Sequence, residues 1–207
     1  MKRKRKGGFL MTLGLLLLAA AFVLTGYNIF ESKRAEMSSE NAITGMEAML
    51  AEKNKTGGDY MEEEIPVYER FPDMEMPVAE VDGKLYIGVV EMPEIGLSLP
   101  VQAGEWNYSK LKSSPCLYKG SLYKDNMVIA GHNYRSHFSK IKTLGIGSEV
   151  IFTDAAGNVF YYEVGWIEVL KPTEVDKMTD AKDWDLTLFT CTYGGRERAT
   201  VRCIRVK

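Results

Sequence analysis

The strongest constraint on this chain of 207 residues is an uncharged run at residues 9–30, which reads FLMTLGLLLLAAAFVLTGYNIF. At about 1.5 Å rise per residue, a helix of this length crosses the roughly 30 Å hydrocarbon core of a bilayer. A buried core helix is the ordinary alternative, but a terminal helix that is apolar on every side would need a large protein around it. The run therefore predicts a transmembrane helix.

The charges that flank this run predict its orientation. Residues 2–6 read KRKRK, whereas only Lys33 and Arg34 follow closely on the other side. The positive-inside rule places residues 1–8, a basic segment, in the cytoplasm and the chain after the run outside the cell. A cleaved signal peptide is the competing interpretation, but VLT at residues 23–25 fits a small-x-small cleavage pattern poorly. We expect an uncleaved signal anchor and a single-pass protein of the cell membrane with an extracellular domain.

Residues 31–82 are predicted to form an acidic extracytoplasmic stalk or linker. They carry 14 acidic and 5 basic residues. Residues 31–53 have a helical composition with a weak apolar stripe that includes Ala42 and Met46, and KTGGD at residues 55–59 ends it. We expect this segment to space the domain from the membrane, with its last part able to pack on the domain.

From residue 83 the pattern becomes that of β-strands, so residues 83–207 are expected to form one mainly β domain. The predicted strands are 85–92, 97–101, 127–131, 149–153, 159–170, 186–191 and 198–206, and short helices are predicted at 106–111 and 137–144. Many short strands, few helices and no alternation of strand and helix point to a closed or nearly closed β-barrel.

Composition argues against several functions. Three cysteines without a Cys-x-x-Cys pair are too few for a disulfide scaffold. His132 and His137 have no nearby cysteine at zinc spacing, so no metal or other cofactor is expected. No basic face or aromatic-basic interleaving suggests nucleic acid. Cys116 and Cys203 are expected to be buried free thiols, with a disulfide between them as the alternative.

The candidate chemistry lies at the ends of two predicted strands. Cys191 ends the strand 186–191, and Arg198 begins the returning strand after a turn that contains two glycines. A cation beside a thiol favours the thiolate and can donate hydrogen bonds to an oxyanion. His132 follows the buried strand 127–131, and an imidazole is the natural acid–base partner of a thiol. A buried structural cysteine is the ordinary alternative.

Four other residues compete for these roles or lie near them. Arg196 is the rival of Arg198, but it lies within the turn. Arg202 and Arg205 are expected at the surface. His137 is expected to cap or pack at the start of the short helix, with catalysis as the alternative.

At these residues the chain resembles the sortases, the membrane-bound cysteine transpeptidases of Gram-positive bacteria. TLFTC at residues 187–191 matches the TLxTC motif of the family, and AGHN at 130–133 resembles its histidine strand end. Arg198 resembles the arginine on the family's last strand. The resemblance covers about residues 85–206, and it implies a sortase-like eight-stranded β-barrel with short helices behind the N-terminal transmembrane helix.

The resemblance also implies a reaction. Cys191 would attack the carbonyl after threonine in a C-terminal sorting signal of a secreted protein and form a thioacyl enzyme. His132 would protonate the leaving amine and later deprotonate the incoming one, and Arg198 would hold the substrate and stabilise the oxyanion. Thr190 and Asn133 are the expected substrate-binding residues; the alternatives are that Thr190 orients the site and that Asn133 orients His132 or serves the turn.

The partners implied are secreted proteins with a sorting signal, and an amine acceptor that is a peptidoglycan precursor or a pilin lysine. GHNY at residues 131–134 looks nearest to class B of the family. Two features depart from that class: Thr192 and Tyr193 follow the cysteine where an acidic residue is frequent, and the connection 171–185 is short. That connection and the region around Trp106 are expected to line the substrate groove.

Two other classes of function stay open from the sequence. One is a secreted Cys/His peptidase that accepts water, although papain-like enzymes place cysteine before histidine. The other is a noncatalytic membrane-tethered β-domain with a buried cysteine. A further expectation concerns residues 68–76, which include Asp73 and are suggested as a lid over the cleft.

Overall fold

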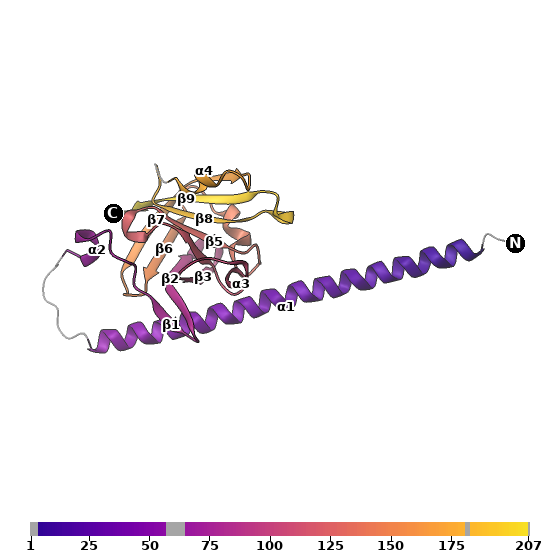
Figure 1. Ribbon diagram of the computed structural model, residues 1–207, viewed down its shortest axis with the longest axis horizontal. Coiled ribbons are helices and arrows are strands. Elements are labelled where there is room, and N and C mark those ends of the chain that lie inside the picture. Colours follow the sequence, from indigo (N-terminus) through magenta and orange to yellow (C-terminus); the bar gives the residue numbers. More distant parts are fainter. Residues whose placement is uncertain (1–3, 57–64, 181–182, 207) are drawn as a thin grey trace.

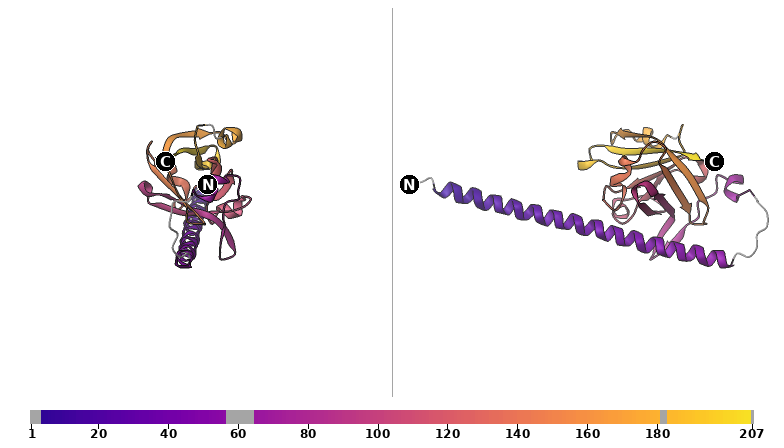
Figure 2. Two further views of the ribbon diagram at one scale, coloured as in Figure 1. Left: turned by 90° about the vertical axis from the view of Figure 1, so that its left-hand side faces the viewer. Right: turned by 180° about the vertical axis from the view of Figure 1, so that it is seen from behind.

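The computed structural model describes residues 4–56, 65–180 and 183–206, and it consists of one very long helix beside a β-barrel (Figure 1). The helix, α1, spans Lys4–Thr56. It runs along the side of the barrel, and its N-terminal half projects far beyond it (Figure 2). The predicted transmembrane run and the first part of the predicted stalk are therefore one continuous helix.

The barrel is built from eight strands with a ninth at its margin. The strands are β1 (Ala79–Val81), β2 (Lys84–Met92), β3 (Leu97–Gln102), β4 (Cys116–Lys119), β5 (Met127–Gly131), β6 (Glu149–Asp154), β7 (Val159–Leu170), β8 (Leu186–Cys191) and β9 (Arg198–Val206). Their order is β1-β2-β3-β4-β5-β8-β9-β7-β6, and pairing of β2 with β6 closes the barrel. The β3–β4 and β5–β8 pairs are parallel and the others antiparallel. The predicted eight-stranded β-barrel is confirmed.

The helices within the barrel domain are all short. They are α2 (Val67–Arg70), α3 (Tyr108–Leu111) and α4 (Val175–Thr179), with 3-10 turns η1 (Pro93–Ile95), η2 (Leu122–Lys124), η3 (Phe138–Thr143) and η4 (Tyr193–Gly195). Every strand predicted from the sequence is present within one or two residues. Two strands were missed, β1 and β4, because each has only three or four residues and little apolar periodicity.

Apolar side chains of alternate strand residues fill the barrel. Val90, Ile129, Phe152, Leu188 and Val201 come from five different strands and are 0% exposed. Alternation decides which residues these are, since successive strand residues point to opposite faces. In β9, Val201 therefore faces the core, while its neighbours on either side face outward. This arrangement frees the outer face of β8 and β9 for other contacts.

The second part of α1 packs against the barrel instead of standing free of it. Its buried residues recur at helical spacing: Glu31, Ala35, Ser39, Ala42 and Met46. Met46 packs with Ala79 and Tyr86 of the barrel margin. Gly45 is close enough to β1 that a Cβ there would lie 2.5 Å from Cγ1 of Val81. The helix is thus docked on the barrel along residues 31–46.

The first part of α1 has the length and composition of a membrane span. Its most apolar 18-residue window has a mean hydropathy of 2.3, and none of that window is buried. An apolar helix with no protein around it is consistent with a membrane anchor or a signal segment.

The segment suggested as a lid lies at the other end of the barrel. Tyr68 stacks on Tyr123 with ring centroids 5.0 Å apart, and Asp73 forms a 2.6 Å ion pair with Lys124. Lys124 lies just before β5 begins, whereas Cys191 lies beside the end of β5. The lid expectation is therefore wrong, because these apolar and charged contacts hold the segment against the opposite end.

Candidate active site

The thiol of Cys191 is presented by a tight hairpin. Cys191 is the last residue of β8, is exposed, and pairs in register with Arg198, the first residue of β9. The turn between them is η4, in which Gly194 and Gly195 have φ values of 80° and 71°. Side chains other than glycine are strained in this left-handed region, so the two glycines allow the chain to return within seven residues.

Parallel pairing brings His132 to the same edge of the barrel. In the β5–β8 pair, Gly131 lies opposite Thr190, so the next residue along each strand is His132 or Cys191. Parallel strands end at the same edge, which places His132 and Cys191 next to each other at the barrel rim. Gly131 is required here because a Cβ would overlap with the buried ring of Phe138.

Two tyrosines hold the imidazole of His132. Tyr134 stacks on it with centroids 3.7 Å apart and planes 25° from parallel. The hydroxyl of Tyr108, in α3, lies 3.5 Å from Nε2. Burial, and secondly the charge of Lys112, lower the pKa of His132 below its usual value. Its Nδ1 is buried and has no hydrogen-bond partner among the described residues.

The thiol, the imidazole and Arg198 line one open groove of about 1580 Å³. Residues of the connection between β7 and β8 line it as well, including Val175 and Met178, and so does Trp106. Both regions were expected from the sequence to line the substrate groove, and both line this groove beside Cys191.

The sequence did not indicate the third wall of the groove. Helix α1 contributes lining residues from Thr25 to Ile43, including Ser32, Glu36 and Ser39. Ser32 contacts the rim directly, where the hydroxyl of Ser136 donates to its carbonyl oxygen at 3.0 Å. The signal available in the sequence was the weak apolar stripe that includes Ala42 and Met46. A helix that is solvated on every side needs no such stripe.

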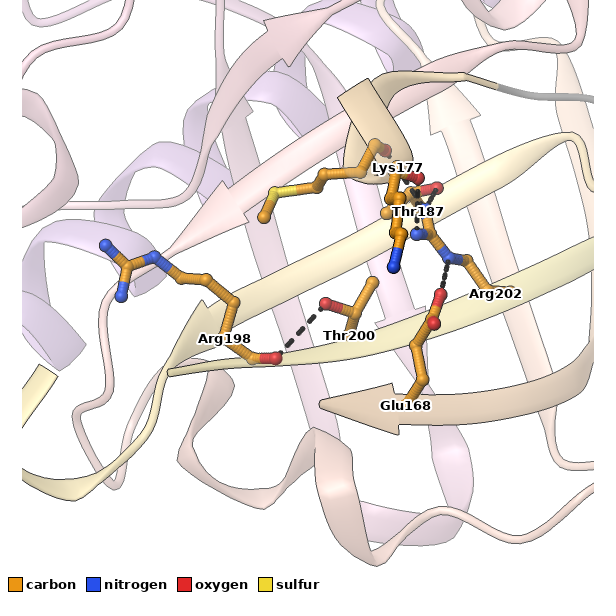
Figure 3. Close-up of polar contacts among 7 residues, drawn as sticks. Glu168, Lys177, Thr187, Arg198, Thr200 and Arg202 are labelled. Carbon is orange, nitrogen blue, oxygen red and sulfur yellow. Dashed lines mark hydrogen bonds and ion pairs between the residues drawn. The ribbon is translucent and has the colours of Figure 1, made fainter. Parts of the chain in front are cut away.

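The four arginines near the C-terminus differ in their surroundings, and Figure 3 shows two of them, Arg198 and Arg202. Arg198 lines the groove, and its Nη1 donates to the carbonyl oxygens of Gly195 and Glu197 at 3.1 Å. Arg196 is exposed on the turn and is not part of the groove lining. Arg205 is half-buried and forms a 3.0 Å ion pair with Asp125.

The surface position expected for Arg202 is wrong. Its side chain is 0% exposed and lies under α4 (Figure 3). The strand composition did not reveal this, because the cover comes from the β7–β8 connection, which has little apolar periodicity. Arg205 also departs from the expectation, since its side chain is only 26% exposed.

The two expected substrate-binding residues lie in different environments. Asn133 lines the groove. Thr190 is only 2% exposed, and its hydroxyl has no hydrogen-bond partner among the described residues. Burial of the Thr190 side chain favours the alternative in which it orients the site over direct contact with substrate.

The remaining thiols and the second histidine are buried. Cys116 and Cys203 are both free, as expected, and burial raises the pKa of Cys116 to about 12. His137 precedes η3, is 0% exposed and makes no side-chain cap, so it packs at the start of the helical turn. In the described parts of the chain, no three His, Cys, Asp or Glu side chains gather in a metal-binding group.

A closed mixed β-barrel with an exposed strand-end thiol beside a histidine and an arginine fits the cysteine transpeptidases. The family model described as the sortase domain matches residues 90–206, more than half of the chain. This chain therefore belongs to the sortase family and is a cysteine transpeptidase.

Known sortases of several classes resemble it. Sortase A of Listeria monocytogenes serovar 1/2a is 24% identical over 195 residues, which cover 92% of this chain and 85% of that protein. Sortase C1 of Streptococcus agalactiae has a TM-score of 0.54 at 26% identity, with 62% of this chain and 71% of that chain covered. A Clostridium perfringens sortase D5 transpeptidase has a TM-score of 0.54 at 22% identity, with 78% and 99% covered. These relatives carry the names of classes A, C and D.

Proposed function

We propose that Cys191, His132 and Arg198 are the catalytic residues of this sortase. The observation that supports the proposal is their convergence from three strands on one groove: Cys191 pairs with Arg198 across the hairpin, and His132 follows β5 directly beside the end of β8. Such a thiol, acid–base group and oxyanion donor are the three parts that acyl transfer through a covalent intermediate requires.

In the first step, the thiolate of Cys191 attacks the scissile carbonyl of the sorting signal and a C–S bond forms. The carbonyl oxygen becomes an oxyanion, which the guanidinium N–H groups of Arg198 stabilise. The C–N bond then breaks as the imidazolium of His132 gives its proton to the leaving amine. The products are a thioacyl enzyme, a free amine and neutral His132.

In the second step, an acceptor amine attacks the thioester and His132 takes its proton. The tetrahedral intermediate expels the thiolate, so the enzyme returns to its starting charges. A thiolate leaves well, which lets an amine compete as the acyl acceptor. Nε2 lies by the hydroxyl of Tyr108 in this structure, so we propose that this weak 3.5 Å contact is released when substrate enters.

The lowered pKa of His132 limits the first step. Acylation needs the imidazolium, and burial disfavours the charged ring, so the protonated fraction falls as the pH rises through this lowered pKa. The thiolate fraction rises with pH in the opposite sense. We therefore expect a bell-shaped pH dependence of acylation.

The substrates implied by the family are proteins with a C-terminal sorting signal. For the acceptor, we propose an amine of a peptidoglycan precursor, with a pilin lysine as the second candidate. The sequence of residues 131–134 suggests class B, whereas the relatives described above have names of classes A, C and D. The subclass of this chain therefore stays a prediction.

We propose a single-pass topology with the N-terminus in the cytoplasm and the catalytic domain, residues 83–207, outside the cell. The basic block at residues 2–6 supports this orientation. The continuity of α1 supports a groove that opens close to the membrane surface, because residues that line it begin at Thr25, within the predicted span at residues 9–30.

The experiment is to incubate the enzyme with a library of sorting-signal peptides, with and without an amine acceptor, and to follow the adducts by mass spectrometry. We expect a thioacyl adduct on Cys191 and a transfer product that depends on the amine. The matched control is Cys116→Ala, which removes a buried thiol and should keep both signals.

Two results would contradict the proposal. Product formed at the same rate without amine would identify a Cys/His peptidase. Failure of both the peptides and a small thiol-reactive probe to label Cys191 in the folded protein would favour a noncatalytic β-domain.

A further inference from the structure

Arg202 is a buried charge for which the proposed reaction has no use. It lies four residues after Arg198 on the same outward face of β9, because Thr200 lies between them at the alternate position. Its side chain is 0% exposed. Burying a guanidinium is costly unless it is fully paired, so its partners indicate what the burial achieves.

The guanidinium joins three separate elements (Figure 3). Nε donates to Oε1 of Glu168 in β7 at 2.8 Å. Nη1 donates to Oγ1 of Thr187 in β8 at 2.8 Å and to the carbonyl oxygen of Met178 at 3.0 Å. Nη2 donates to the carbonyl oxygen of Lys177 at 2.8 Å.

Two of these bonds hold the C-terminal end of α4. The last carbonyl groups of a helix have no intrahelical partner, and a cation at that end is favourable. A helix of five residues such as α4 is not stable by itself in water. The ion pair of Glu174 with the exposed Lys177 contributes little. Arg202 is therefore a buried polar anchor of α4.

The position of α4 determines the shape of the groove beside the thiol. Val175 and Met178 line the groove, and Met178 belongs to the same buried apolar cluster as Phe189. Phe189 lies on the same outward face as Cys191, two residues before it. A shift of α4 would therefore change the space directly next to the nucleophile.

Thr187 gives the TLFTC segment a second task. Its hydroxyl is fully buried and accepts from Arg202, which pairs with it in register across the hairpin. The β8–β9 hairpin thus presents Cys191 and Arg198 at its tip. Four residues from the tip on each strand, Thr187 and Arg202 pair with each other, and Arg202 holds α4.

We propose that Arg202 is a positioning residue that fixes α4 as a wall of the acyl-donor groove and so governs donor affinity without touching the reacting atoms. The inference rests on the proposed function in one respect, that the groove beside Cys191 receives the donor. It does not depend on which sorting signal or which amine is used.

The test compares Arg202→Met with Arg205→Met, a matched change on the same strand. Arg205 pairs with Asp125 and packs over the ring of Phe160 at the opposite end of the barrel. Single-turnover formation of the thioacyl adduct is measured at increasing concentration of donor peptide. We expect Arg202→Met to raise the half-saturating concentration about ten-fold, since hydrogen bonds from a charged donor are lost. The maximal rate should stay within about three-fold.

A second measurement follows α4 directly. Amide hydrogen exchange in residues 175–179 should become faster in Arg202→Met while exchange in β8 stays unchanged, and Arg205→Met should alter neither. Arg202→Lys keeps the charge but loses the planar fork, so we expect an intermediate donor affinity. If Arg202→Met does not fold, Arg202→Lys carries both measurements.

The inference is overturned if α4 exchange and donor half-saturation both stay at the parent values, or if Arg205→Met shifts them equally. A fully active Arg202→Lys would also overturn it, because charge alone would then suffice. Failure of the proposed function is a different result, in which no donor peptide acylates even the parent enzyme. The exchange measurement still decides the role of Arg202 in that case.

Discussion

The polar groups around Asp154 and those around Cys191, at opposite ends of the barrel, differ in their hydrogen bonding. At the end opposite the groove, the buried carboxylate of Asp154 accepts four hydrogen bonds, from the hydroxyl of Tyr123, the backbone N–H groups of Ala156 and Asn158, and the Asn158 side chain. At the groove end, Cys191 is exposed, and Nδ1 of His132 and the hydroxyl of Thr190 are buried without partners among the described residues.

This difference separates stability from chemistry. A satisfied buried network rigidifies the fold, because each member would be costly to leave unpaired. Groups that react must instead be free to change partners, so the groove end gives up some stability. Mutations at the far end should therefore lower the free energy of unfolding without changing the rate of acylation. Mutations of the reacting groups at the groove end should lower that rate with little change in the free energy of unfolding.

The largest expected effect is that of Cys191→Ala. Removal of the nucleophile should reduce both thioacyl formation and amine transfer below detection. The free energy of unfolding should change by less than about 0.5 kcal/mol, because the side chain is exposed. Mass spectrometry and urea unfolding measure the two quantities. Near-normal transfer by this variant would contradict the assignment of the chemistry to Cys191 at the groove end.

The next effect is that of Arg198→Ala. Loss of an oxyanion donor costs about 10²–10³ in rate, and the exposed hairpin should still fold, so transfer should fall while the thermal midpoint hardly moves. Arg196→Ala is the control, since Arg196 lies two residues away and is not part of the groove lining. Equal losses in the two variants would show that only general positive charge matters.

Asp154→Ala tests the far end. It leaves the buried hydroxyl of Tyr123 and the turn of Asn158 without their acceptor. We expect the free energy of unfolding to fall by about 3 kcal/mol, as measured by urea titration. Donor half-saturation of the folded fraction should stay unchanged. If Asp154→Ala instead lost acylation with an unaltered free energy of unfolding, the far end would serve the chemistry and not the stability of the fold.

Much of this arrangement was predictable from the sequence. Apolar runs located the strands, and the strand ends located Cys191, His132 and Arg198, because alternation and turn residues are local signals. The burial of Arg202 and the docking of α1 were not predictable in this way. Both arise when segments far apart in sequence pack together: Arg202 meets Met178 at 24 residues' separation, and Ser32 meets Ser136 at 104.

The pH dependence of stability offers a further test of this comparison, through His137. His137 is fully buried at the groove end, both ring nitrogens lack partners among the described residues, and burial lowers its pKa to about 4. The unfolded chain binds this proton near pH 6.5, so stability is lost as the pH falls from about 6.5 toward 4. At pH 5 the loss should be about 2 kcal/mol, at about 1.4 kcal/mol per pH unit.

The variant His137→Phe removes the titrating group and keeps an aromatic ring in the packed site. Urea unfolding between pH 7 and 5 should show a smaller loss of stability in the variant than in the parent protein. His132 titrates in the same sense because its pKa is also lowered, so some loss should persist in the variant. If the two proteins lose stability equally, the buried imidazole of His137 does not lower the stability of the folded protein at acidic pH. The contrast between the ends then rests on Cys191, His132 and Thr190 alone.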